Sequence, residues 1–252
     1  MNIPLIQINT IDKREIEKLF TFLDLINIDL TNCNLDTNSY EELKVLYRTI
    51  SFGSRLKQFA DNCLYKNETG FMVVDLGEND YSETRLKKVL LLILSGLLIP
   101  YGIFDRFGMF REIGVNLTKS PNSSTGIGYI PFHIDFINTT FPPYYSSLFC
   151  IREDSNGGGE TILSNILQAI KKLTTEEQKL LYDKCFTEGM FFGLNNVGVE
   201  LNPFPILDTY VDPIIRYTSK IASDDFYNPI VRKIEHLLIK NQRVFLLKAN
   251  QL

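Results

Sequence analysis

One pair of side chains in the sequence has the types and the spacing of metal ligands: His133 and Asp135, in the segment IGYIPFHIDF. A single residue separates the two, and residues i and i+2 of a β-strand point to the same face of a sheet. An imidazole and a carboxylate on one face are part of the ligand set of non-haem Fe(II) sites. Such sites use two histidines and one carboxylate and leave positions open for a cosubstrate and O2. His-x-Asp pairs are common, so this interpretation needs support from the residues that follow.

Two further motifs follow the pair along the chain. A Pro-Pro turn leads into the apolar segment SSLFCIRE, and a triple-glycine turn opens GGGETILSN, in which Thr161 lies 26 positions after Asp135. A hydroxyl beside a glycine-rich turn can approach a small anion closely, because glycine leaves the backbone uncovered. Taken alone, Thr161 would be interpreted as a residue of high β-propensity at the start of a strand.

The succession of PFHIDF, PPYYSSLFCIRE and GGGETILSN resembles the taurine dioxygenase / clavaminate synthase-like family of Fe(II)/2-oxoglutarate-dependent oxygenases. The resemblance covers residues 70–252, and residues 133–165 are its specific part. It implies that His133 and Asp135 bind iron and that the Thr161 hydroxyl binds the 2-oxoglutarate carboxylate. It also implies that O2 and 2-oxoglutarate are consumed while an amino acid or a similar small polar metabolite is oxidised. Hydroxylation is the expected outcome, and desaturation or cyclisation would use the same ligands.

The sequence departs from this family at its second metal-binding histidine and at the arginine that pairs with the far carboxylate of 2-oxoglutarate. Apart from His133 the sequence has one histidine, His236, which lies among charged residues in VRKIEHLLIK. That setting favours a solvated surface histidine over a ligand. The final KANQL fits the start of the turn that precedes the family's second histidine.

We therefore expect that the sequence is truncated relative to the whole enzyme, or that it is a shortened homologue. An end within a core sheet would leave an unpaired strand edge, which favours truncation. With two ligands and no arginine partner, weak Fe(II) binding and slow 2-oxoglutarate turnover are expected. The alternative function is that of a non-catalytic jelly-roll protein that binds a ligand or a partner.

Arg216 is the one fixed positive charge in the segment 191–217, whose glycines and prolines interrupt short apolar runs. Loops carried by rigid strands often decide specificity. One interpretation is therefore that this segment covers the pocket and that Arg216 binds a carboxylate or sulfonate of the substrate. The other is that Arg216 pairs with an internal Asp or Glu, and the sequence leaves the two open.

The spacing of apolar residues and the positions of turn residues predict the helices and strands that would position these side chains. Helices are expected at about 12–23, 40–64, 89–99, 164–182 (with a second helix starting at 174–178) and 228–240, and strands at 70–77, 110–117, 127–136, 146–153 and 243–248. The expected fold class is mainly β with added helices (α+β), a double-stranded β-helix or jelly roll with an N-terminal helical buttress. We expect a single domain over 1–252, with a helical part at 1–69 and a jelly-roll core at 70–252 that is incomplete at its C-terminus.

Charge and composition exclude several classes of protein. The net charge is −4 without Lys/Arg clusters, which argues against nucleic acid and anionic membranes as partners. The longest apolar run, 89–99, is shorter than the roughly 20 residues that span a bilayer, and the N-terminus lacks the features of a signal peptide. The four cysteines are scattered, as in reduced cytoplasmic proteins. The expected partners are a small-molecule substrate and O2, and the sequence gives no oligomeric state.

Overall fold

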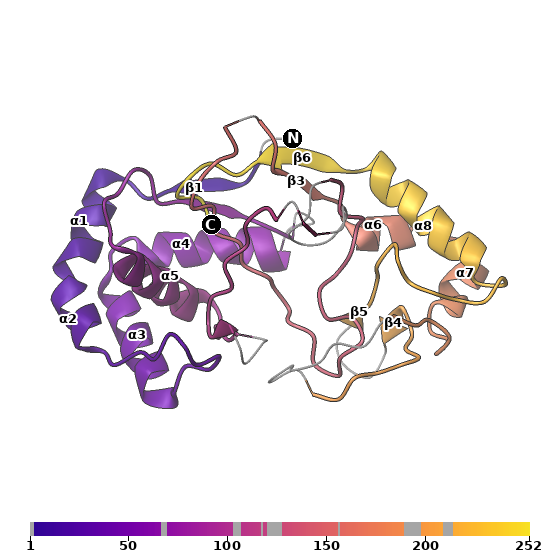
Figure 1. The fold of residues 1–252 in the computed structure, drawn as a ribbon, viewed down its shortest axis with the longest axis horizontal. Helices are drawn as coiled ribbons and strands as arrows, with labels where there is room; N and C mark the ends of the chain where they lie inside the picture. Colours follow the sequence, from indigo (N-terminus) through magenta and orange to yellow (C-terminus); the bar gives the residue numbers. More distant parts are fainter. Residues whose placement is uncertain are drawn as a thin grey trace. The chain divides into compact units, whose positions relative to one another are not determined.

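The computed structural model describes residues 3–66, 70–102, 107–116, 118–119, 128–155, 157–188, 198–208 and 214–252. Its residues form two compact units (Figure 1). Unit 1 comprises Met1–Arg111, Ser147–Thr161 and Leu246–Leu252, and unit 2 comprises Glu112–Ser146 and Ile162–Phe245. The organisation as a single domain over 1–252 stays a prediction.

Helix α5 (Glu83–Leu97) forms the centre of unit 1. Its residues Val89, Leu92 and Ile93 are 0% exposed, so the longest apolar run of the sequence is a core helix, as predicted. The other helical elements of this unit are α1 (Thr10–Lys18), α2 (Phe20–Leu25), α3 (Thr37–Thr49), α4 (Gly53–Ala60) and the π-helical η1 (Asp61–Lys66). Among the described helices, none has the length and apolar character needed to cross a membrane.

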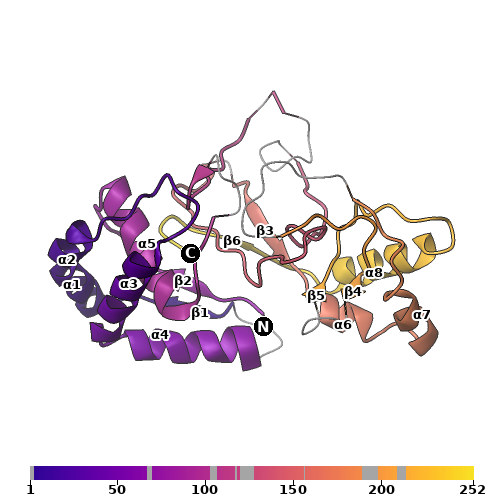
Figure 2. The ribbon, with the colours of Figure 1, turned by 90° about the horizontal axis from the view of Figure 1, so that it is seen from below.

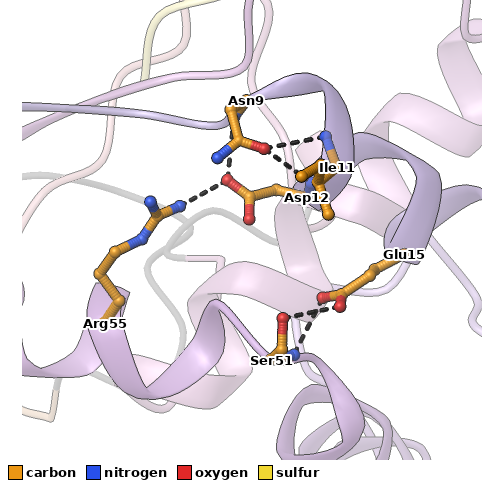
Figure 3. Close-up of polar contacts among 6 residues, drawn as sticks. All are labelled: Asn9, Ile11, Asp12, Glu15, Ser51 and Arg55. Atoms are coloured by element: carbon orange, nitrogen blue, oxygen red, sulfur yellow. Dashed lines mark hydrogen bonds and ion pairs between the residues drawn. The ribbon is translucent and has the colours of Figure 1, made fainter.

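Polar contacts tie α1 to the segment at the start of α4 (Figure 3). Asn9 and Asp12 form a capping box, in which each side chain accepts a hydrogen bond from the other residue's backbone N–H. Asp12 also pairs with Arg55 of α4. Glu15 accepts hydrogen bonds from the backbone and the hydroxyl of Ser51, and these contacts lower the pKa of Glu15. The helical character predicted for the N-terminal part is therefore confirmed for its described residues.

The strands of unit 1 are short. β1 (Leu5–Gln7) pairs in parallel with β2 (Val73–Asp75). On the other side of β2, Leu252 and Val74 exchange backbone hydrogen bonds of 2.9 and 2.8 Å. Cys150 in turn exchanges backbone hydrogen bonds with the Asn250–Gln251 segment. Residues far apart in the sequence thus lie side by side at β2.

Unit 2 packs its helices against a second apolar core (Figure 2). Its elements are α6 (Ile166–Ile170), α7 (Thr175–Leu180), α8 (Asn228–Lys240), β4 (Leu207–Asp208) and β5 (Ile214–Ile215), together with the second half of β3 (Glu160–Leu163) and most of β6 (Arg243–Leu246). β4 pairs with β5 in an antiparallel hairpin, and β3 pairs with β6. Helix α8 has the predicted bounds, and it buries Ile230, Val231, Ile234 and Leu238.

The α+β description is confirmed, but the described residues contain more helix than strand. The segments 110–116 and 146–153, which alternation and β-propensity predict as strands, form no regular strand there. In the segment 146–153, Cys150 exchanges backbone hydrogen bonds with Asn250 and Gln251 without forming a strand. Alternation favours a strand only where a partner strand continues alongside, and a single sequence does not reveal the partner.

Gly96 of α5 provides a test of the packing in unit 1. A Cβ at this position would lie 2.2 Å from the Tyr47 ring of α3, so the two helices approach where glycine has no side chain. Gly96→Ala should destabilise the protein by about 1–3 kcal/mol through overpacking, although alanine favours a helix by about 1 kcal/mol. Gly114→Ala is the matched control, because no atom lies within 4 Å of its added Cβ. Urea unfolding of both variants measures the difference, and equal stabilities would contradict this packing.

Candidate metal centre

His133 and Asp135 lie in unit 2, on a segment that runs antiparallel to residues 217–219. The backbone N–H of Ile134 donates to Tyr217 O at 2.8 Å, and His133 bridges to Thr218. Phe132 and Ile134 pack against the unit 2 core. His133 and Asp135 project away from that core, and 46% and 45% of their side chains are exposed. The strand predicted at 127–136 is not formed in its described residues, because His133 makes a single bridge and Asp135 lies in a turn.

One ring nitrogen of His133 is fixed by its own chain. Nδ1 lies 2.8 Å from the carbonyl oxygen of Pro131. A carbonyl oxygen can only accept, so Nδ1 carries the proton and the Nε2 of a neutral ring keeps its lone pair. A backbone carbonyl on the far nitrogen is the usual way in which a metal-binding histidine is oriented.

The carboxylate of Asp135 is held in a similar way. The Ser146 hydroxyl, which follows the Pro-Pro turn, donates to Asp135 Oδ2 at 2.9 Å. The other oxygen, Oδ1, lies 3.6 Å from His133 Nε2. This separation is too long for a hydrogen bond. If the imidazole is neutral, two atoms with lone pairs lie next to each other. A cation between them, either a second ring proton or a metal ion, would remove the repulsion.

The two donors fit a divalent metal ion. Two atoms bound to one ion through bonds of about 2.1 Å are at most about 4.2 Å apart, so Nε2 and Oδ1 can share an ion from their present separation. A third protein ligand is not seen: the described residues contain no group of three or more His, Cys, Asp or Glu that could hold a metal. His236 is exposed on α8, as predicted from its charged neighbours.

Arg216 has internal partners. It is 1% exposed, its Nη1 donates to the carbonyls of Ile137 and Thr139 at 2.6 and 2.5 Å, and its Nη2 lies 3.4 Å from Asp208 Oδ2. Burial lowers the pKa of Arg216, and the charge of Asp208 acts in the opposite direction. The structure therefore shows the internal pairing that the sequence left open, and a role of Arg216 in substrate binding stays a prediction. Of the segment 191–217, residues 191–197 and 209–213 lie outside the described residues.

Thr161 lies in β3 of unit 1, directly after the glycine turn, and is partly buried. Gly157 and Gly159 have φ of +78° and +80°, a left-handed backbone that other residues rarely adopt. The turn predicted from the triple glycine is thus confirmed. The role of Thr161 in binding 2-oxoglutarate stays a prediction.

Glu188 is a neighbour of His133 that sequence reasoning missed. Burial raises the pKa of its carboxyl, and the charges of His133 and Lys220 act in the opposite direction, so Glu188 lies within electrostatic reach of the candidate centre. It follows His133 by 55 positions in a segment without a recognisable motif. No local pattern in the sequence could have identified it.

Comparison with known proteins identifies the fold of this chain through similar solved structures. No protein-family model matches the sequence, and no curated protein matches it. An asparagine oxygenase in complex with Fe(II), 2S,3S-3-hydroxyasparagine and succinate is similar over 98% of this chain and 83% of that chain, with a TM-score of 0.75 and 15% identity. The non-heme iron oxygenase OrfP in complex with Fe and alpha-ketoglutaric acid is similar over 98% and 83%, with a TM-score of 0.68 and 13% identity. The chain therefore has the fold of these oxygenases, which confirms the resemblance drawn from PFHIDF and GGGETILSN at the level of the fold.

The contact with Pro131 predicts the tautomer of His133. In the metal-free protein at a pH where the ring is neutral, we expect His133 to carry its proton on Nδ1, because Nδ1 faces a carbonyl oxygen. Nitrogen-15 chemical shifts of the two imidazoles distinguish the tautomers, with exposed His236 as the internal reference. A proton on Nε2 of His133 would contradict the arrangement.

Because the pKa of Glu188 is raised, Glu188→Gln should increase the stability of the fold by an amount that depends on pH. A carboxyl with a raised pKa stabilises the fold below its ordinary value of 4.5, and this contribution is lost as the pH rises through the raised value. Glu188→Gln should therefore raise the thermal unfolding midpoint at pH 7, and the gain should disappear near pH 4. The exposed Glu176 of α7 gives the control Glu176→Gln. An equal gain at both pH values would refute this prediction.

Proposed function

We propose that this protein is an Fe(II)/2-oxoglutarate-dependent oxygenase that oxidises, by hydroxylation, an amino acid or a similar small polar metabolite. The main support is a pair of atoms that can donate electron pairs to a metal, His133 Nε2 and Asp135 Oδ1. They lie 3.6 Å apart in a chain with the fold of iron oxygenases. The amino-acid class is supported by the complexes of two similar structures, one with 2S,3S-3-hydroxyasparagine and one with (3R,4R)-dihydroxy-L-Arg.

In this proposal the chain's own residues bind and orient. His133 would hold Fe(II) through Nε2 and Asp135 through Oδ1, while Pro131 and Ser146 keep the two side chains in place. The Thr161 hydroxyl would donate to the carboxylate of 2-oxoglutarate. Bound Fe(II) with 2-oxoglutarate and O2 supplies the oxidation of an unactivated C–H bond, which no side chain can carry out.

We also propose the finer description of the fold, a single domain built on a double-stranded β-helix with residues 1–69 as a helical buttress. The TM-score of 0.75 with the asparagine oxygenase supports it.

A second candidate function is the binding of a ligand or partner without catalysis. The observation that favours it is the ligand count: the sequence has two histidines, and the described residues hold no group of three metal-ligating side chains. A protein of this kind would bind its ligand equally well with and without metal.

Anaerobic titration with Fe(II) and 2-oxoglutarate tests the proposal. We expect the visible charge-transfer band of an Fe(II)–2-oxoglutarate chelate. His133→Ala and Asp135→Ala should each weaken its formation at least tenfold, because each removes one of two protein ligands. His236→Ala is the matched control and should leave the band unchanged.

In air, succinate should then form and increase with one member of a panel of L-amino acids. If the band were the same in the wild type and in His133→Ala, the metal assignment would be wrong. If an amino acid bound equally with and without Fe(II), and no succinate formed, the second candidate function would replace the first.

A further inference from the structure

Asp135 lies between two stretches of chain that are both held by the short segment 216–219. Before Asp135, the backbone of residues 132–134 pairs with residues 217–219. After Asp135, the carbonyls of Ile137 and Thr139 accept hydrogen bonds from the Arg216 guanidinium. Backbone contacts and one side chain of a single segment therefore fix the chain on both sides of the carboxylate.

The turn that follows Asp135 needs such support. Phe136 has a φ of +57°, a left-handed backbone that is uncommon for a residue with a side chain, and such residues persist where their surroundings hold them. The next three residues, Ile137 to Thr139, are at most 1% exposed, so their carbonyls depend on protein donors. On the far side of the turn, Thr140 N donates to Val199 O at 2.9 Å.

Arg216 is well suited to this task. Its planar guanidinium presents several donors in a fixed geometry, and one nitrogen reaches both carbonyls while another lies near Asp208. Asp208 is 14% exposed at its side chain and balances the buried charge. The backbone of Arg216 is also anchored, because its N–H donates to Ile206 O at 2.8 Å.

We propose that Arg216, paired with Asp208, is a positioning residue for the metal ligand Asp135. By holding the Ile137 and Thr139 carbonyls, it fixes the turn that sets Asp135 Oδ1 beside His133 Nε2. The proposal rests on the proposed function, because it assigns Arg216 a role toward the metal pair. It goes beyond a structural ion pair in one respect: loss of Arg216 weakens metal binding more than its effect on stability explains.

Co(II) titration of the apoprotein tests this, with the visible absorption of bound Co(II) reporting ligand geometry and urea unfolding reporting stability. Arg216→Lys keeps the positive charge but loses the fork of donors, and Asp208→Asn keeps the shape but removes the balancing charge. We expect Arg216→Lys to bind Co(II) about tenfold more weakly and to show altered absorption bands. About tenfold is the lower end of the affinity loss that is typical when a residue orienting a metal ligand is changed. Asp208→Asn should weaken binding in the same direction and serves as the test if Arg216→Lys does not fold.

Ile234→Val on α8 is the matched control, because it lowers stability from within the same unit's core and leaves the contacts of Arg216 in place. It should bind Co(II) like the wild type. The proposal would be overturned if folded Arg216→Lys or Asp208→Asn bound Co(II) with wild-type affinity and spectra. It would also be overturned if their loss of Co(II) affinity were no larger than that of Ile234→Val at an equal loss of stability. His133→Ala separates this failure from that of the proposed function: if it binds Co(II) as well as the wild type does, the metal pair itself is wrong and the proposal falls with it.

Discussion

His133 Nδ1 and the carbonyl oxygen of Pro131 are 2.8 Å apart, a distance that requires a proton on Nδ1. This contact leaves Nε2 as the free nitrogen, and Nε2 lies 3.6 Å from Asp135 Oδ1. The Ser146 hydroxyl occupies the other carboxylate oxygen, so Oδ1 is the atom left facing the ring. Two electron-rich atoms 3.6 Å apart favour a cation between them, and a metal ion bound by both would supply it.

The backbone around the pair is restrained more tightly than a surface turn requires. The pair itself is half exposed, whereas Ile137 to Thr139, directly after it, are buried and bonded to Arg216. Exposed ligands on a buried, anchored backbone combine access for a small molecule with a fixed geometry. Glu188 adds a partly buried negative charge near His133, which further favours a cation at this place.

Local sequence patterns were sufficient for the helices and for the relation between the two ligands. The apolar run of α5 and the 3.6-residue spacing of Ile230, Ile234 and Leu238 predicted buried helices, because such patterns depend only on the element itself. The i, i+2 spacing likewise placed His133 beside Asp135.

What failed depended on partners elsewhere in the chain. The segment 110–116 alternates but has no regular strand alongside it, and a second strand cannot be inferred from alternation alone. For Arg216 the sequence left an internal partner open, and the fold brings it to Asp208 across the β4–β5 hairpin. The sequence matches no family model. The similarity to oxygenases of 13–15% identity is found by comparing backbone structures.

Metal binding by His133 and Asp135 is tested most directly by anomalous scattering from crystals of this protein grown with Mn(II), a redox-stable substitute for Fe(II). We expect one strong anomalous peak about 2.1 Å from both His133 Nε2 and Asp135 Oδ1, with Nδ1 still bonded to Pro131. A peak at other residues, or no peak near either atom at saturating Mn(II), would contradict it.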